Sequence, residues 1–323
     1  MSNRLKLFSL GISIVIGASG AEFAFAQPPT KPNDQAQGDA KSSTQGAVSR
    51  GSKSADSKSG DSKAKSAPNP DDPYAGPRER MIKKSLIDRG IKNPRVIEAF
   101  RTVPRHKYFP PDSFRLAYED ESAPIGQGQT ITAPFEVAYM TEILDPQPTD
   151  KIYEVGTGSG FQASILSRLA KEVYSVEIKE PLGKRAAQVI KELGYNNIKT
   201  RIGDGYEGWP EAAPFDAIIV TCSPSKIPQP LIDQLKEGGR MIIPIGTRHE
   251  QELIYLVKKN GKMLAKPLRG TLFVPMTGRA LEEAERARGG AKPKAKTKSK
   301  PRIAPSEKDE AKAKKSASGE DES

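Results

Sequence analysis

The stretch I-Y-E-V-G-T-G-S-G, residues 152–160, places an apolar run directly before a turn with glycine at every second position. The run predicts a buried strand, and the apolar positions after Gly160 predict a helix. A backbone without Cβ atoms turns tightly between the two and approaches a ligand closely, with helix N–H groups facing an anionic end. Dinucleotide-binding proteins need Gly-x-Gly-x-x-Gly, and Phe161 stands at that sixth position, so the spacing disfavours a dehydrogenase.

Strand-like and helix-like segments alternate on both sides of this turn. Strands are expected at 151–155, 172–177, 198–202, 215–221 and 240–245, and helices at 160–170, 181–193 and 228–235. This alternation predicts βαβ units and a parallel sheet covered by helices on both faces. The last two strand-like runs, 252–258 and 264–274, flank Asn260-Gly261, which is a hairpin signal. The expected fold is therefore α/β, a doubly wound and mostly parallel sheet with antiparallel terminal strands.

The segment before the sheet predicts helices and a long connection. Residues 78–88 have apolar positions near helical spacing and end at Gly90. Asn93-Pro94 is typical of an N-cap followed by proline in the first helical position. Residues 103–134 are expected to be rich in loops, and a helix-like stretch, 135–144, follows them.

The two ends of the chain differ in composition from its middle. Arg4 and Lys6 precede a short apolar run, and Ala24-Phe25-Ala26 carries small residues where a signal peptidase cleaves. We therefore expect a signal peptide at 1–26 and a periplasmic or secreted protein; an uncleaved anchor or a wrong start codon, with a cytoplasmic protein, is the alternative. Low-complexity composition predicts disorder in the linker, 27–73, and the tail, 285–323, which leaves 74–284 as the globular domain.

The positive net charge of the chain is concentrated in part in its tail, so it is weak evidence for the partner of the globular domain. The net charge is +11 over 323 residues, which favours nucleic acid or an anionic surface as a partner. From Arg286 onward there are 12 Lys and Arg against 6 Asp and Glu, a net of +6. About half of the excess thus lies in the tail. With the single cysteine Cys222, and with His106 and His249 far apart, no metal site is expected.

Two acidic residues follow the glycine turn, each at a predicted strand end. Glu177 comes 17 positions after Gly160, at the end of the second strand of the sheet. In an open α/β sheet that end lies at the same crevice as the first turn, where a carboxylate accepts hydrogen bonds from ribose hydroxyls. Asp204-Gly205 follows the third strand and suits an adenine ring and its amine. The three elements in this order favour S-adenosylmethionine.

A loop without charged residues, I-G-Q-G-Q-T-I-T-A-P at 125–134, stands just before the sheet. Its hydroxyls, amides and glycines suit a loop that closes over a cofactor and presents a hydroxyl to a substrate. On composition alone it could equally be an ordinary surface loop.

Six runs of sequence occur in one order along residues 79–278: IGQGQTITAP, EVGTGSGFQASIL, VYSVEI, IGDGYEGWPEAAPFDAIIVT, QLKEGGRMIIPIG and LFVPM. Together they resemble the protein-L-isoaspartate O-methyltransferase family, whose fold is a Rossmann-like methyltransferase. The resemblance implies methyl transfer from S-adenosyl-L-methionine to the free α-carboxylate of isoaspartyl residues in damaged proteins. The ester then closes to a succinimide, which hydrolyses in part to normal aspartate. The resemblance implies isoaspartyl proteins or peptides as partners, and the chain is expected to act as a monomer.

The resemblance assigns roles to individual residues. The family's active-site hydroxyl, usually serine, falls on Thr132. Cofactor-binding positions fall on Thr130, Ile131, Ala133, Glu154, Gly156, Thr157, Gly158, Gly160, Glu177, Asp204 and Gly205. Two departures lie near the expected substrate edge: Cys222-Ser223-Pro224-Ser225 replaces small residues, and Leu272 stands where the family often has arginine. The peptide preference is therefore expected to differ.

Two other functions are compatible with parts of the sequence. One is a non-catalytic binding module, an exported relative that keeps the fold. S-adenosylmethionine is made in the cytoplasm, and such a module would not need a supply of it outside. A nucleic-acid methyltransferase would explain the basic charge, but Thr221-Cys222-Ser223-Pro224 lacks the Asn/Asp-Pro-Pro-aromatic signature of amino-directed enzymes.

Because a carboxylate is ionised at neutral pH, isoaspartyl methylation needs no general base, only positioning and desolvation.

Overall fold

The computed structural model describes residues 72–287. The predicted signal peptide and almost all of the linker and tail lie outside these residues. The chain divides into a unit that ends at Leu281 and a second that begins at Glu282, of which residues 282–287 are described as the end of helix α7. Among the described residues, no helix is both long and apolar enough to cross a membrane.

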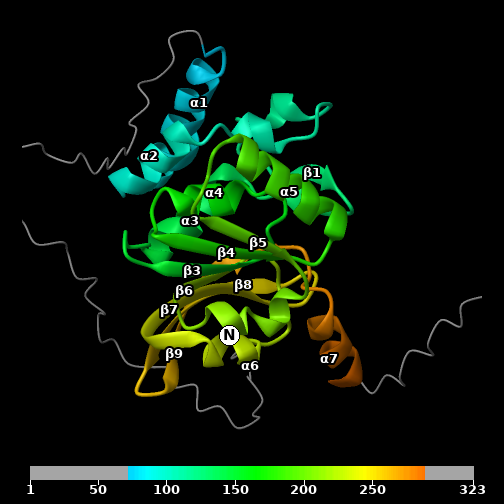
Figure 1. Cartoon of the computed structure of the whole chain (residues 1–323). Coiled ribbons are helices and arrows are strands. Elements are labelled where there is room, and N and C mark those ends of the chain that lie inside the picture. The colour runs from blue at the N-terminus through cyan, green and yellow to red at the C-terminus, as the bar shows by residue number, and fades with distance from the viewer. Residues whose placement is uncertain (1–71, 288–323) are drawn as a thin grey trace, which may run out of the picture. The chain divides into compact units, whose positions relative to one another are not determined.

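A seven-stranded sheet forms the centre of the first unit, in the order β5-β4-β3-β6-β7-β8-β9 (Figure 1). The first five strands run parallel, and β8 and β9 are antiparallel to their neighbours, as the sequence predicts. The strands are β3 (Lys151–Val155), β4 (Glu172–Glu177), β5 (Ile198–Ile202), β6 (Phe215–Val220), β7 (Leu235–Gly246), β8 (Gln251–Lys259) and β9 (Lys262–Thr271). This is the predicted doubly wound α/β fold.

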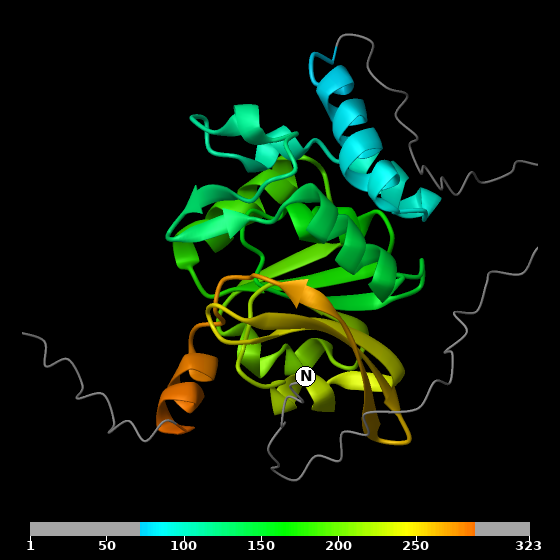
Figure 2. The ribbon, with the colours of Figure 1, turned by 180° about the vertical axis from the view of Figure 1, so that it is seen from behind.

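Helices cover both faces of the sheet (Figures 1 and 2). Alternate residues of a strand point to opposite faces, and β3 shows this directly. Ile152 packs in one core cluster with Met140 of α3 and Leu166 of α4. Its neighbour Tyr153 packs in another with Leu231 of α6. The helices are α1 (Ala75–Met81), α2 (Pro94–Thr102), α3 (Pro134–Leu144), α4 (Phe161–Ser167), α5 (Glu180–Glu192), α6 (Gln229–Asp233) and α7 (Arg279–Ala287).

The N-terminal helices follow the predicted signals, with one change of helix type. Asn93 caps α2, because its side chain accepts a hydrogen bond from the Arg95 N–H at 2.9 Å. Helix α1 is shorter than the predicted helix 78–88. It continues as a π-helical turn, Ile82–Leu86, and a 3-10 turn, Ile87–Arg89. Gly90 then ends the segment in the left-handed conformation with φ of 100°, as expected for glycine after a helix.

The stretch expected to be loop, 103–134, contains regular structure. Strands β1 (Ala123–Gly126) and β2 (Gln129–Ile131) form an antiparallel hairpin, and short 3-10 turns cover Arg105–Tyr108 and Phe114–Leu116. Gln127 and Gly128, with φ of 54° and 69°, make the two-residue turn between the strands. Each strand has four residues or fewer, which is too short for alternation to reveal it. The hairpin holds the 125–134 loop in a fixed shape.

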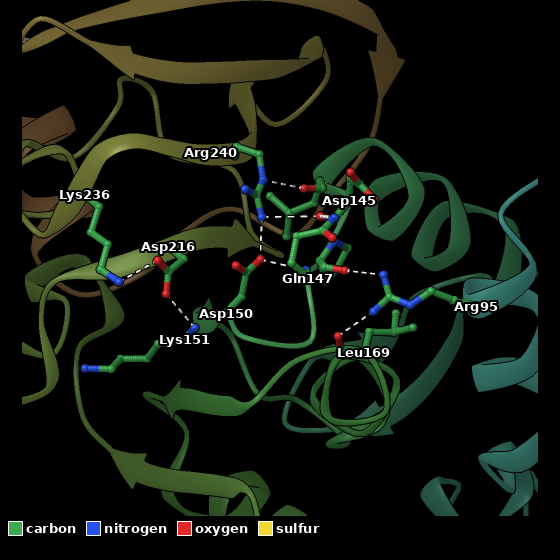
Figure 3. Close-up of polar contacts among 11 residues, drawn as sticks. Arg95, Asp145, Gln147, Asp150, Lys151, Leu169, Asp216, Lys236 and Arg240 are labelled. Carbon is green, nitrogen blue, oxygen red and sulfur yellow. Dashed lines mark hydrogen bonds and ion pairs between the residues drawn. The ribbon is translucent and has the colours of Figure 1, made fainter. Parts of the chain in front are cut away.

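A polar network joins the amino ends of the parallel strands to one another and to α3 (Figure 3). Arg240 of β7 donates to the carbonyl oxygen of Leu144, at the end of α3, over 2.9 Å and pairs with the carboxylate of Asp150. Asp216 accepts a hydrogen bond from the Lys151 N–H over 2.8 Å and pairs with Lys236. These contacts lie at the amino ends of β3 and β6, so they join α3 to the sheet at the edge opposite to the carboxyl ends of those strands.

Candidate active site

A cavity opens at the carboxyl ends of the parallel strands, where open α/β sheets bind ligands. Residues from β2 and its loop, from the turns after β3, β4, β5 and β6, and from the segment after β9 share its lining. These residues are Gln129, Thr130, Ile131, Thr132, Val137, Val155, Gly156, Thr157, Gly158, Ser159, Phe161, Gln162, Val176, Glu177, Ile178, Lys179, Asp204, Gly205, Thr221, Cys222, Val274, Pro275, Met276 and Thr277. Segments that are more than 100 positions apart in the chain therefore meet around one cavity.

The glycine turn after β3 forms one wall with backbone alone. Gly156 has a φ of 93°, and a Cβ atom there would lie 2.6 Å from Thr221 Oγ1. That hydroxyl donates to the carbonyl oxygens of Val155 and Gly156, both at 2.9 Å. A side chain at this position would thus be strained and would displace the contact that joins β3 to β6. Glycine leaves the backbone open to a ligand.

Glu177, at the end of β4, faces the same turn. Its Oε2 atom accepts a hydrogen bond from the Gly158 N–H at 2.8 Å, and its Oε1 atom accepts one from the Lys179 N–H at 2.9 Å. The residue is 5% exposed. The two backbone donors fix the carboxylate at the cavity wall, and each oxygen keeps lone-pair capacity for a further donor.

Asp204, after β5, is held in a similar way. One carboxylate oxygen accepts from the Tyr206 N–H at 2.9 Å and the other from the Arg279 N–H at 2.7 Å. A Cβ atom on Gly278 would lie 2.3 Å from this carboxylate. The segment after β9 therefore closes tightly over Asp204, and its Met276 and Thr277 join the lining.

Thr132 lies in the loop between β2 and α3 and lines the cavity together with Thr130 and Ile131. The loop is fixed by its backbone. The Thr132 carbonyl oxygen accepts a hydrogen bond from Arg105 at 2.7 Å, and the Ala133 N–H donates to Ser122 Oγ at 3.2 Å. Three residues later, the Phe135 N–H donates to Asp120 at 2.8 Å where α3 begins.

The structure brings nine of the twelve sequence-predicted site residues together at the cavity wall: Thr130, Ile131, Thr132, Gly156, Thr157, Gly158, Glu177, Asp204 and Gly205. Ala133, Glu154 and Gly160 stand outside the lining. Gly160 is the residue before α4, and a Cβ atom on it would lie 3.2 Å from a side-chain carbon of Ile190. Its missing side chain serves the packing of α4 on α5.

Glu154 is fully buried behind the wall, under the glycine turn. Ser175 donates to its Oε2 atom at 2.6 Å, and Ser175 in turn shares a hydrogen bond of 2.6 Å with Thr157. Burial, helped by the charge of Glu177, raises the pKa of Glu154 to about 8, against the opposing hydrogen bond from Ser175. At neutral pH the carboxyl is therefore mostly protonated, and Glu154 supports Thr157 from behind the cavity.

Several lining residues carry no signal in the sequence. Thr221, Lys179 and Gln162 reach the cavity only because their strands and helices end at one edge, which no local pattern records. Cys222 also lines the cavity, and burial raises the pKa of its thiol above the ordinary range. Within residues 72–287, no group of three or more His, Cys, Asp and Glu side chains could hold a metal ion.

Comparison with known proteins identifies relatives of this chain. Its residues 77–281 match the model of the protein-L-isoaspartate(D-aspartate) O-methyltransferase family. A protein-L-isoaspartate O-methyltransferase of Opitutus terrae is 50% identical over 201 residues, which are 62% of this chain and 86% of that protein. One from Gloeobacter violaceus is 48% identical over 198 residues, which are 61% of this chain and 97% of that protein.

Two solved structures similar to this chain carry the same family name. A protein-L-isoaspartate O-methyltransferase structure is 28% identical, with a TM-score of 0.60 over 66% of this chain and 69% of its own. A Plasmodium falciparum protein, described under the same name and solved in complex with S-adenosyl-L-homocysteine, is 27% identical, with a TM-score of 0.56 over 62% of this chain and 98% of its own. The chain belongs to the protein-L-isoaspartate(D-aspartate) O-methyltransferase family.

Proposed function

We propose that this cavity binds S-adenosyl-L-methionine and that the chain methylates the free α-carboxylate of isoaspartyl residues in damaged proteins and peptides. The observation that carries the proposal is the convergence of the Thr130–Thr132 loop, the glycine turn, Glu177 and Asp204 on one cavity. Family membership and the product complex of the Plasmodium falciparum relative support it. Repair follows once the ester exists, because its ring closure to a succinimide needs no further enzyme.

The residues of the cavity fit such a ligand. A fixed carboxylate at Glu177 suits a pair of ribose hydroxyls, and the backbone at Gly156 approaches without side-chain hindrance. Ile178, Asp204 and Gly205 line the cavity together, and we assign the adenine ring to this part of its wall. The bound cofactor supplies an electrophilic methyl group on a sulfonium.

The chain contributes position rather than acid–base chemistry. The substrate carboxylate is ionised at neutral pH, so its oxygen attacks without a general base. The Thr132 hydroxyl orients that carboxylate from the loop above the glycine turn. The Cys222 thiol, whose pKa is raised by burial, stays protonated. Since the thiolate is the nucleophilic form, a protonated thiol does not compete for the methyl group.

A methyl-transfer assay with two matched peptides tests the proposal. The peptides differ only in an isoaspartate or a normal aspartate at one position, and the methyl group of the cofactor is radiolabelled. We expect label in the isoaspartyl peptide alone. Thr132→Ala is expected to lose most of the rate, whereas Thr132→Ser, which keeps the hydroxyl, retains it. Equal labelling of both peptides contradicts the substrate assignment, and a chain that binds no cofactor in calorimetry is a non-catalytic relative.

We also propose that the protein is exported and acts as a monomer. Export is supported by the charged, apolar and small-residue sequence of residues 1–26. Mass spectrometry of protein purified from its native cell is expected to find Gln27 at the N-terminus. Light scattering is expected to give the mass of a single chain. An N-terminus at Met1, or twice that mass, contradicts the respective proposal.

A further inference from the structure

Arg105 is a buried cation that contacts the loop between β2 and α3, which carries Thr132. It opens the 3-10 turn Arg105–Tyr108 and is 1% exposed. Its guanidinium carbon lies 4.5 Å from the ring centre of Phe161 and 5.5 Å from that of Phe109. Its Nη2 atom donates to the carbonyl oxygen of Thr132 at 2.7 Å. Among the described residues, its Nε and Nη1 atoms have no hydrogen-bond partner.

Such an environment is unfavourable for stability. Burial lowers the pKa of Arg105 to about 9, while the charge of Asp120 opposes the shift, so the side chain is still a cation at neutral pH. Two buried donors without partners each cost free energy. An apolar side chain of similar length would fill the same space between the two rings and avoid that cost, since replacing buried ionic groups by apolar ones often stabilises a protein. Folding alone therefore does not explain an arginine here.

The contact that Arg105 makes is with one peptide group of the active-site loop. The Thr132–Ala133 peptide is held at both ends, its oxygen by Arg105 and its N–H by Ser122 Oγ at 3.2 Å. Fixing this peptide fixes the backbone of Thr132 on its C-terminal side. The direction of the Thr132 side chain depends on that backbone. Arg105 also packs on Phe161, so it links the loop to the start of α4, where the glycine turn ends.

We propose that Arg105 is a positioning residue, which holds the Thr132–Ala133 peptide so that the Thr132 hydroxyl meets the substrate carboxylate. This inference rests on the role proposed above for Thr132. It assigns the buried cation a task that an apolar side chain cannot perform, because the loop carbonyl needs a donor at that place. The misplacement of a reacting group by about 1 Å can cost on the order of 100-fold in rate.

A double-mutant cycle tests whether Arg105 acts through Thr132. Arg105→Met keeps the length and apolar contacts but removes the charge and the donors. We expect it to lower kcat on the isoaspartyl peptide about 30- to 100-fold, with the KM for the cofactor changed less than about threefold and the melting temperature kept or raised. In a Thr132→Ala background the same change is expected to lower kcat less than about threefold, because interacting residues are not additive. Arg105→Lys, which keeps a charge and a donor, is expected to recover part of the loss.

Two further variants keep the result interpretable. Arg240→Met removes a different arginine, which is partly buried and lies at the amino ends of the strands, and is expected to lower the melting temperature without changing kcat. Ser122→Ala removes the acceptor at the N–H end of the same peptide. It is expected to lower kcat in the unsubstituted chain but not in the Thr132→Ala background, and it replaces Arg105→Met as the test if that variant does not fold. An equal loss from Arg105→Met in both backgrounds, or no loss in either, overturns the inference. If Thr132→Ala itself has no effect, the role proposed for Thr132 fails and this inference fails with it. If the unsubstituted chain does not methylate the peptide, the proposed function fails instead.

Discussion

Glu177 Oε2 accepts a hydrogen bond from the Gly158 N–H at 2.8 Å, which joins the acid at the end of β4 to the glycine turn after β3. The two sequence elements that most favoured a cofactor site therefore hold each other before any ligand is bound. A preformed pair of this kind lowers the cost of ordering the site when the ligand enters.

Glu177→Gln is expected to weaken cofactor binding. The amide keeps the shape of the side chain but loses the charge, and one of its two terminal atoms becomes a donor that cannot accept from Gly158 or Lys179. Hydrogen bonds to a charged group contribute about 1.5–3 kcal/mol, so the dissociation constant measured by calorimetry should rise about 10- to 100-fold. Glu172→Gln is the matched control, because Glu172 lies at the other end of β4 and pairs with Lys199. Equal affinities for both variants would contradict the assignment of Glu177.

Glu154 is expected to make the stability of the protein depend on pH. Its folded pKa of about 8 lies above the ordinary value of 4.5. The protonated form is thus favoured by folding, so its contribution is complete below about pH 4.5 and is lost as pH rises toward 8. Urea unfolding between pH 5 and 8 should show the free energy of unfolding of the unsubstituted chain falling relative to that of Glu154→Gln, by at most about 1.4 kcal/mol per pH unit. Parallel curves for the two proteins would show that Glu154 is ionised when folded.

Arg240→Met is expected to destabilise the fold without affecting catalysis. Arg240 pairs with Asp150, whose side chain is 8% exposed, and donates to the end of α3. Breaking a buried pair costs about 3–5 kcal/mol, and the partial exposure of Arg240 reduces this to about 2–3 kcal/mol. Denaturant unfolding measures the loss, and the double variant with Asp150→Asn should lose less than the sum of the two single variants. Additive losses would mean that the pair contributes little.

Cys222 is expected to react slowly with thiol reagents. Burial raises the pKa of its thiol, so the thiolate fraction at pH 8 is small. The rate of alkylation by iodoacetamide should be at least about tenfold below that of a free cysteine at that pH, and S-adenosyl-L-homocysteine should lower it further, since Cys222 lines the cavity. The urea-unfolded chain serves as the control. Fast alkylation that the ligand does not slow would place the thiol outside the binding site.

Much of the fold could be predicted from the sequence, and the reason lies in strands such as β3 and β4. Both are apolar runs bounded by turn residues, and both have the predicted bounds. The β1–β2 hairpin escaped prediction because its strands are too short to show a period. The helix predicted at 78–88 is helical throughout, but α1 ends at Met81 and the segment continues as π-helical and 3-10 turns, which the apolar pattern does not tell from an α-helix.

The candidate site was less predictable, for a physical reason. Sequence patterns marked the strand ends that contribute Gly156, Glu177 and Asp204 to one edge. They could not distinguish Thr157, which lines the cavity, from Glu154, which supports it from behind. Nor could they show that Arg105 contacts Thr132, because nothing in the local sequence records a contact between positions 27 residues apart.

The Arg240–Asp150 network and the cavity occupy opposite ends of the same parallel strands. Contacts that stabilise the fold and residues that line the cavity therefore lie at opposite ends of the strands of one sheet. A protein engineer can strengthen the first end for heat tolerance, or reshape the second to accept other damaged peptides, with little interference between the two.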